Sequence, residues 1–194
     1  MNFLAHIYLS GNNDLIKIGN FMADGIRGKD YLLFPEDVKK GILLHRQIDT
    51  FTDSHLVYRK SKHRLHEKYG HYSGVIMDIL YDHFLAKNWD FYSKDKLEHF
   101  VNSFYQALYF NENILTEKTK KILLFMVQKN WLLSYATISG IEKILFQMDY
   151  RTKHRGKMHE SVIELNKFYK EFEFEFTIFF DELIKFSQQK LLEL

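Results

Sequence analysis

The chain lacks cysteine, has a single proline and contains no long apolar run. The absence of cysteine excludes disulfides, thiolate nucleophiles and zinc–thiolate sites, and fits a reducing compartment. No apolar run approaches the roughly 20 residues that a membrane-spanning helix needs. The first ten residues also lack the basic segment with which a signal peptide begins. We therefore expect a soluble, cytoplasmic protein with no membrane partner.

An excess of charge of one sign is also missing. The 194 residues include 27 Lys and Arg against 25 Asp and Glu, for a formal net charge of +2. Because no global positive field results, the composition gives no indication of nucleic-acid binding. The apolar fraction of 46% lies in the range of globular proteins. This length fits one domain, and we expect residues 1–194 to form it.

The scarcity of proline favours an all-α fold, because long helices exclude proline from their interiors. Pro35 is followed by Glu36 and Asp37, an order typical of the first turn of a helix. Apolar residues recur at steps of three and four after several residues that can cap a helix. The predicted capping residues are Ser73, Ser93 and Thr116.

The last forty residues are rich in phenylalanine. Between Phe172 and Ile178 apolar residues alternate with polar ones, so a strand is one local interpretation. The spacing of three and four nevertheless continues through Leu183, which favours a helix. The sequence as a whole predicts an all-α, single-domain bundle of about seven or eight helices.

Four short segments in the first half carry acids and histidines inside otherwise apolar sequence. They are Asn2–His6 (NFLAH), Gly19–Gly28 (GNFMADGIRG), His45–Asp53 (HRQIDTFTD) and Asp78–His83 (DILYDH). A single such group is more often a solvated charge or a hydrogen-bonded histidine. Their recurrence is unexpected on structural grounds alone, because an unpaired buried acid is costly. These segments therefore indicate an enzyme.

Residues four apart lie on one face of a helix, so His45 and Asp49 point the same way, as do Asp78 and Asp82. Each pair could hold a cation from one side. Imidazole with carboxylate suits manganese, iron or zinc, whereas carboxylates and water alone suit magnesium. His83 lies about a hundred degrees round the helix from Asp82 and could reach such a cluster only at its rim.

Glycines surround Asp24. Two arginines lie close to the acids and histidines of the four segments, one three residues after Asp24 and one directly after His45. Gly19, Gly25 and Gly28 either let the backbone approach a ligand or end a helix. Their spacing matches neither the Walker nor the dinucleotide-binding pattern. The two arginines that could bind a phosphate through a bidentate fork are Arg27 and Arg46.

One segment, residues 55–71, is distinctly basic. It contains four histidines and a single acid, Glu67, and its basic residues are Arg59, Lys60, Lys62, Arg64 and Lys68. Such a segment is either a solvated helix face or a docking surface for an acidic partner.

Together the four motifs, with the last extended to Trp89 (DILYDHFLAKNW), resemble those of the acyl carrier protein phosphodiesterases, also called acyl carrier protein hydrolases. The resemblance by motif covers about residues 1–90. It implies an enzyme that removes the 4′-phosphopantetheine arm from holo acyl carrier protein and leaves the apo form. It also implies a divalent cation, typically Mn²⁺ with Mg²⁺ or Fe²⁺ as alternatives, and a distant relationship to the HD-type metal phosphohydrolases and their helical fold.

The resemblance also suggests roles for individual residues. The chain has no His-Asp dipeptide, so ligands are taken only from positions that match the phosphodiesterase motifs. Arg27 or Arg46 would offset phosphoryl charge, and Asp53 or His83 would protonate the departing serine oxygen. The surface that would meet the acidic carrier consists of Arg59, Lys60, Lys62 and Arg64. The expected metal ligands are His6, Asp24, His45, Asp49 and Asp82, with His83 as a further candidate.

Two other functions stay open from the sequence. The same ligands could serve a metal phosphohydrolase that acts on a small nucleotide or another phosphodiester. Alternatively, the chain could be a non-catalytic helical module that binds an acidic partner protein through its basic segment.

Overall fold

The computed structural model describes the backbone of residues 1–194 and all side chains but that of Arg151. Regular structure in this range is helical throughout, which confirms the predicted all-α class. Eight helices have nine residues or more: α2 (Asp14–Met22), α3 (Glu36–Ser54), α4 (Leu56–Tyr69), α5 (Ser73–Lys87), α7 (Leu97–Phe110), α8 (Glu117–Gln128), α10 (Ile138–Arg151) and α12 (Tyr169–Glu193). Shorter α-helices are α1 (Phe3–Tyr8), α6 (Trp89–Tyr92), α9 (Trp131–Ser134) and α11 (Val162–Lys167), and 3₁₀ turns are η1 (Ala23–Gly25), η2 (Asp30–Leu33), η3 (Gly70–Tyr72), η4 (Glu112–Ile114) and η5 (Met158–Ser161).

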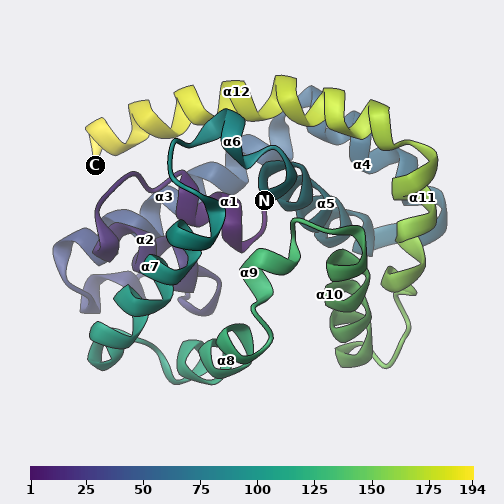
Figure 1. Cartoon of the computed structure of the whole chain (residues 1–194). Coiled ribbons are helices and arrows are strands. Elements are labelled where there is room, and N and C mark those ends of the chain that lie inside the picture. The colour runs from purple at the N-terminus through teal and green to yellow at the C-terminus, as the bar shows by residue number, and fades with distance from the viewer.

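The C-terminal helix α12 runs along one edge of the molecule, and α3, α4 and α5 pack against it (Figure 1). Helix α1 lies in the interior, between α2 and α5, and α8 lies at the edge opposite α12 (Figure 1). One core cluster of buried apolar side chains connects residues from α1 through α12. No helix among the described residues is both long enough and apolar enough to cross a bilayer.

The C-terminal aromatic segment is helical, as its spacing of three and four predicted. Phe172, Phe176, Phe179 and Phe180 are completely buried in the core, whereas Phe174 is exposed. An alternating strand would have placed Phe172, Phe174 and Phe176 on one face. Helix α12 thus supplies an apolar stripe that covers the bundle.

The predicted starts of α3, α5 and α8 are confirmed, whereas of the three predicted caps one is confirmed and two are wrong. Helix α3 begins directly after Pro35, and the Thr116 hydroxyl accepts the Thr119 N–H at the start of α8. Ser73 is instead the first residue of α5, and its hydroxyl donates to the carbonyl of Gly70. Ser93 accepts the N–H of Asp95 within a turn, three residues before the N-cap of α7. Short polar residues favour turns as well as caps, so the sequence pattern alone does not separate the two.

Helices α2 and α3 approach each other unusually closely. A Cβ added to Gly19 would lie 2.1 Å from the carbonyl oxygen of Val38, and one added to Gly41 would lie 2.1 Å from that of Ile16. We had predicted that Gly19 either ends a helix or lets the backbone approach a ligand. It does neither, and instead lets the backbones of two helices pack together. This crossing places Asn20 of α2 beside His45 of α3.

Candidate metal centre

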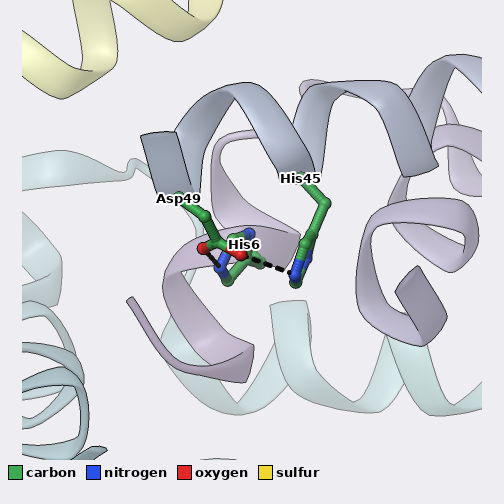
Figure 2. A group of neighbouring side chains, drawn as sticks. All are labelled: His6, His45 and Asp49. Atoms are coloured by element: carbon green, nitrogen blue, oxygen red, sulfur yellow. Dashed lines mark ion pairs between the residues drawn. The ribbon is translucent and has the colours of Figure 1, made fainter. Parts of the chain in front are cut away.

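Three separate elements of the first 54 residues bring four of the predicted ligands together. His6 comes from α1, Asp24 from η1, and His45 and Asp49 from successive turns of α3. Figure 2 shows His6, His45 and Asp49 with their polar atoms turned toward one another. The two imidazole rings stack with their centroids 4.1 Å apart and their planes 19° from parallel.

The polar atoms of this cluster are spaced like ligands of a common ion. His6 Nε2 lies 3.3 Å from Asp49 Oδ1, and His45 Nε2 lies 3.0 Å from Asp49 Oδ2. Asp24 Oδ1 is 3.2 Å from the same His45 nitrogen. Atoms that bind one ion at about 2.1 Å lie about 3.4 Å apart in tetrahedral geometry. His6 Nε2 is buried and makes no hydrogen bond to the described residues, so the donor set fits a metal.

The electrostatics of the cluster also favour a cation. Burial, reinforced by the neighbouring charge of His45, lowers the pKa of His6 to about 4, so this imidazole is neutral at pH 7. Burial also lowers the pKa of His45, but its hydrogen bonds to Asp24 and Asp49 outweigh that effect and raise it to about 9. The hydrogen bond from His45 holds the pKa of Asp24 below its usual value. Burial raises the pKa of Asp49, but contacts with both histidines outweigh it and hold that pKa well below its usual range.

A cavity of about 290 Å³ opens beside the cluster. Its lining residues are Met1, Asp24, His45, Asp49, Thr52, Asp53, Tyr58, Val75 and Asp78. Among these residues, Asp78 Oδ1 accepts hydrogen bonds from the Tyr58 hydroxyl at 2.7 Å and from the Met1 amino group at 2.9 Å. The lining of the cavity therefore includes both candidate ligands and polar groups that are held by hydrogen bonds.

Comparison with known proteins gives a match along nearly the entire chain. The family model described as acyl carrier protein phosphodiesterase matches residues 1–183. The chain belongs to the acyl carrier protein phosphodiesterase family.

Curated members of this family resemble the chain along its full length. A protein named acyl carrier protein phosphodiesterase from Photorhabdus laumondii is 31% identical, over 98% of this chain and 96% of its own. Proteins of the same name from Pectobacterium atrosepticum and Escherichia coli K12 are 26% and 28% identical, each over 99% of this chain and all of its own. No solved structure matches the chain significantly.

Among the residues predicted for the phosphodiesterase site, the structure brings His6, Asp24, His45 and Asp49 into one cluster. Asp53 lies one turn beyond Asp49 on α3 and lines the same cavity. Asp53 is exposed to solvent, and its role in proton transfer stays a prediction.

Asp82, predicted as a ligand, and His83, named as a further candidate, do not join the cluster in the structure. Asp82 is completely buried and accepts the N–H groups of Asn2 at 3.1 Å and Leu4 at 2.7 Å, at the start of α1. Burial raises its pKa to about 7. Since both its oxygens bind backbone N–H groups, Asp82 positions the helix that carries His6.

His83 points to another part of the core. Its Nδ1 pairs with the carbonyl oxygen of Tyr135 at 2.7 Å, and its Nε2 pairs with the Tyr169 hydroxyl at 2.9 Å. Both ring nitrogens are therefore engaged in packing α5 against α9 and α12. This arrangement leaves no nitrogen of His83 for a metal or a proton transfer in the cavity.

Neither predicted phosphate-binding arginine is among the residues that line the cavity, and their role stays a prediction. Arg46 donates to the carbonyl of Ile26 at 3.2 Å and lies over the ring of Tyr31. Arg27 is exposed in the segment that follows η1. Gly28, the next residue, has a φ of +48°, in the left-handed region that favours glycine.

The basic segment forms α4, and its four predicted docking residues divide into two pairs. Arg64 binds the buried carboxylate of Glu175 on α12 with both guanidinium nitrogens, and Lys60 lies 3.1 Å from the same carboxylate. We had expected Arg64 to face a partner, but it joins two helices instead. Arg59 and Lys62 line an open hollow of about 540 Å³, together with Leu56, Lys60, His63 and His66.

Several residues of the centre were not singled out in the sequence. Asn20 is completely buried in contact with both histidines, and Tyr58 and Thr52 line the cavity. Asn20 and Thr52 lie inside the motifs that were recognised. A polar residue inside an apolar helical stretch was the available signal for Asn20. Tyr58 gave no signal, because its partner Asp78 is 20 residues away.

Proposed function

We propose that the chain is a metal-dependent phosphodiesterase that hydrolyses 4′-phosphopantetheine from holo acyl carrier protein and yields the apo carrier. The observation that carries this proposal is the convergence of His6, His45, Asp24 and Asp49 at the edge of one cavity. Membership of the acyl carrier protein phosphodiesterase family supplies the substrate.

The ion would be held by Nε2 of both histidines and by the carboxylates of Asp24 and Asp49. Mixed imidazole and carboxylate donors suit Mn²⁺ or Fe²⁺ better than Mg²⁺, which prefers oxygen alone, so Mn²⁺ is our first choice. When bound, such an ion polarises a phosphoryl oxygen and lowers the pKa of water toward neutrality. The buried Nε2 of His6, which makes no hydrogen bond within the described part of the chain and lies 3.3 Å from Asp49 Oδ1, supports this assignment.

The chain's own residues complete the reaction. Water attacks phosphorus, and the bond between phosphorus and the serine oxygen of the carrier breaks. Asp53, in the lining of the cavity, would take the proton that the attacking water loses and pass it to that departing oxygen. The products are the carrier with a free serine hydroxyl and 4′-phosphopantetheine.

The exposed basic residues of α4 would receive the carrier protein. Tyr58 of this helix lines the cavity, and its neighbour Arg59 lines the adjacent hollow with Lys62. A positive surface beside the cavity would raise the association rate of an acidic carrier.

An intact-mass assay of holo acyl carrier protein tests the proposal. The purified chain with Mn²⁺ should remove the phosphopantetheine mass, and a chelator should prevent the loss. Asp24→Ala and His45→Ala should abolish turnover, whereas Asp90→Ala, at an exposed position in α6, should not.

The remaining outcomes would contradict the proposal in distinct ways. Unchanged turnover in both Asp24→Ala and His45→Ala would show that the cluster takes no part in the reaction. Intact holo carrier together with metal-dependent cleavage of a small chromogenic diester would favour a small phosphodiester as substrate. Carrier binding without metal uptake or cleavage would favour a non-catalytic module.

A further inference from the structure

We infer that Asn20 is a positioning residue that holds His6 in the tautomer protonated at Nδ1, so that the Nε2 lone pair faces the metal centre. The inference rests on the proposed metal centre and assigns a role to a residue outside the ligand set. The two tautomers of a neutral imidazole differ in which nitrogen is free to bind a metal.

The orientation of the Asn20 amide follows from its surroundings. One end of the amide lies 3.0 Å from the carbonyl oxygen of His6 and 2.9 Å from Ser10 Oγ. The Ser10 hydroxyl itself donates to that same carbonyl at 2.8 Å. A carbonyl oxygen only accepts hydrogen bonds, so the group that faces it must be the Asn20 NH₂. The Asn20 side-chain oxygen therefore points the other way.

That oxygen in turn determines the tautomer of His6. Asn20 Oδ1 lies 2.8 Å from His6 Nδ1, and an amide oxygen has no proton to donate. His6 Nδ1 must therefore carry the hydrogen. The neutral ring then turns an unprotonated Nε2 toward Asp49 Oδ1, 3.3 Å away. Two acceptors at this distance repel each other, and a cation held between them would remove that repulsion. Asn20 is completely buried, so water does not compete for either end of its amide.

His45 is held in the same way by a second, independent contact. Its Nδ1 lies 2.9 Å from the backbone carbonyl oxygen of Asn20 and 3.1 Å from the side-chain Oδ1. The backbone carbonyl would remain if the side chain were replaced. Loss of the Asn20 side chain should consequently release the tautomer of His6 and leave the Nδ1 proton of His45 in place.

Nitrogen-detected NMR of metal-free protein labelled with ¹⁵N-histidine tests this directly. The wild-type His6 ring should show a protonated Nδ1 and an unprotonated Nε2 at pH 7. In Asn20→Leu the His6 signals should shift toward the form protonated at Nε2, while His45 keeps its Nδ1 proton. Ser10→Ala is the matched control, because it removes a hydroxyl from the same network but leaves the Asn20 oxygen, and His6 should keep its tautomer.

A second variant keeps the inference testable if Asn20→Leu does not fold. Asn20→Asp has nearly the same shape and retains an oxygen toward His6, so it should preserve the protonated Nδ1. A wild-type His6 protonated at Nε2 would overturn the inference without any variant. An unchanged His6 tautomer in folded Asn20→Leu would overturn it as well.

Titration with Mn²⁺ separates this inference from the proposed function. Loss of a residue that orients a ligand typically weakens metal binding about 10- to 100-fold, and we expect this loss for Asn20→Leu but not for Ser10→Ala. Wild-type protein that shows the expected tautomer but binds no metal would refute the proposed function and leave the role of Asn20 in the tautomer intact. Metal binding of unchanged strength in Asn20→Leu would refute the positioning role alone.

Discussion

At the scale of single residues, Asp49 contacts both histidines, whereas Asp24 contacts only His45. We predict that Asp49→Asn lowers kcat/KM for holo carrier by at least about 100-fold, because losing even an orienting partner of a ligand costs 10- to 100-fold. Asp24→Asn should cause a smaller loss. Initial rates from intact-mass assays at saturating Mn²⁺ would measure both.

The helix content of both variants, measured by circular dichroism, controls for unfolding. An Asp49→Asn variant that is fully folded and as active as Asp24→Asn would contradict the ranking, and with it the view that Asp49 joins the two imidazoles.

The charge state of His45 predicts how metal affinity depends on pH. Its pKa of about 9 means that the metal-free site carries a proton on His45 at pH 7, which an incoming ion must displace. His6, with a pKa of about 4, releases none. Apparent Mn²⁺ affinity should therefore rise about tenfold per pH unit up to about pH 9, with about one proton released per ion.

Calorimetric titration in two buffers that differ in ionisation enthalpy would count that proton. Equal affinity at pH 7 and pH 8 would show that His45 is already neutral in the metal-free protein. The result would then favour weaker contacts between His45 and its two carboxylates than the structure shows.

The residues of the cluster could be predicted only in part, for a physical reason. Helical spacing correctly placed His45 and Asp49 on one face, and they meet in the cluster. The same spacing says nothing about what that face meets, so Asp82 was assigned to the metal although it holds the start of α1. Whether a polar side chain joins the cluster or binds backbone N–H groups of another helix depends on how the helices pack. Sequence periodicity does not contain that information.

At the scale of the elements, the crossing of α2 and α3 positions the centre. In Gly41→Ala the new methyl group would lie 2.1 Å from the Ile16 carbonyl oxygen and 2.7 Å from the Asn20 nitrogen, so the helices must move apart. We predict a loss of about 1–3 kcal/mol in the free energy of unfolding, typical of overpacking. Urea denaturation followed by circular dichroism would measure it, and Mn²⁺ affinity should fall with it because α2 carries Asn20.

Gly74→Ala in α5 is the matched control. Its methyl group would meet only the Lys62 side chain, at 3.9 Å, and alanine is favoured over glycine in a helix by about 1 kcal/mol. This variant should be as stable as the wild type or more so. Equal destabilisation of both variants would show that the α2–α3 crossing is not specially tight.

The helices themselves were more predictable than their ends. Apolar spacing along residues 172–183 correctly predicted α12, because each step of three or four returned a side chain to the core. The caps at Ser73 and Ser93 failed because a short polar side chain serves a turn as well as a helix start. Gly19 was also misread, since a glycine required by a neighbouring backbone looks the same in sequence as one required by a turn.

At the scale of the whole molecule, contacts between segments far apart in the sequence decide which basic side chains of α4 are free to bind a partner. Arg64 and Glu175 are 111 positions apart and form a bidentate pair between α4 and α12. No local pattern in the sequence connects them, so Arg64 was grouped with the docking residues. Arg59 and Lys62 remain beside the open hollow, and they are the better test of carrier docking.

We predict that the double variant Arg59→Glu and Lys62→Glu lowers kcat/KM for holo carrier at least about tenfold at low salt, mainly through KM. Opposite charges steer association and like charges oppose it, over a screening length of about 10 Å at 0.1 M salt. The loss should therefore shrink as salt is added. Cleavage of a small chromogenic diester, which needs no docking surface, should be unchanged.

The matched control reverses the same number of charges elsewhere, with Lys94→Glu and Lys96→Glu in the exposed segment before α7. These changes alter the net charge equally, so any difference between the two double variants belongs to the position of the charge. If both double variants lower kcat/KM for holo carrier equally, the carrier responds to the net charge of the molecule. In that case α4 is not its docking surface. If only the α4 variant does so and salt restores it, the basic residues beside the cavity receive the carrier.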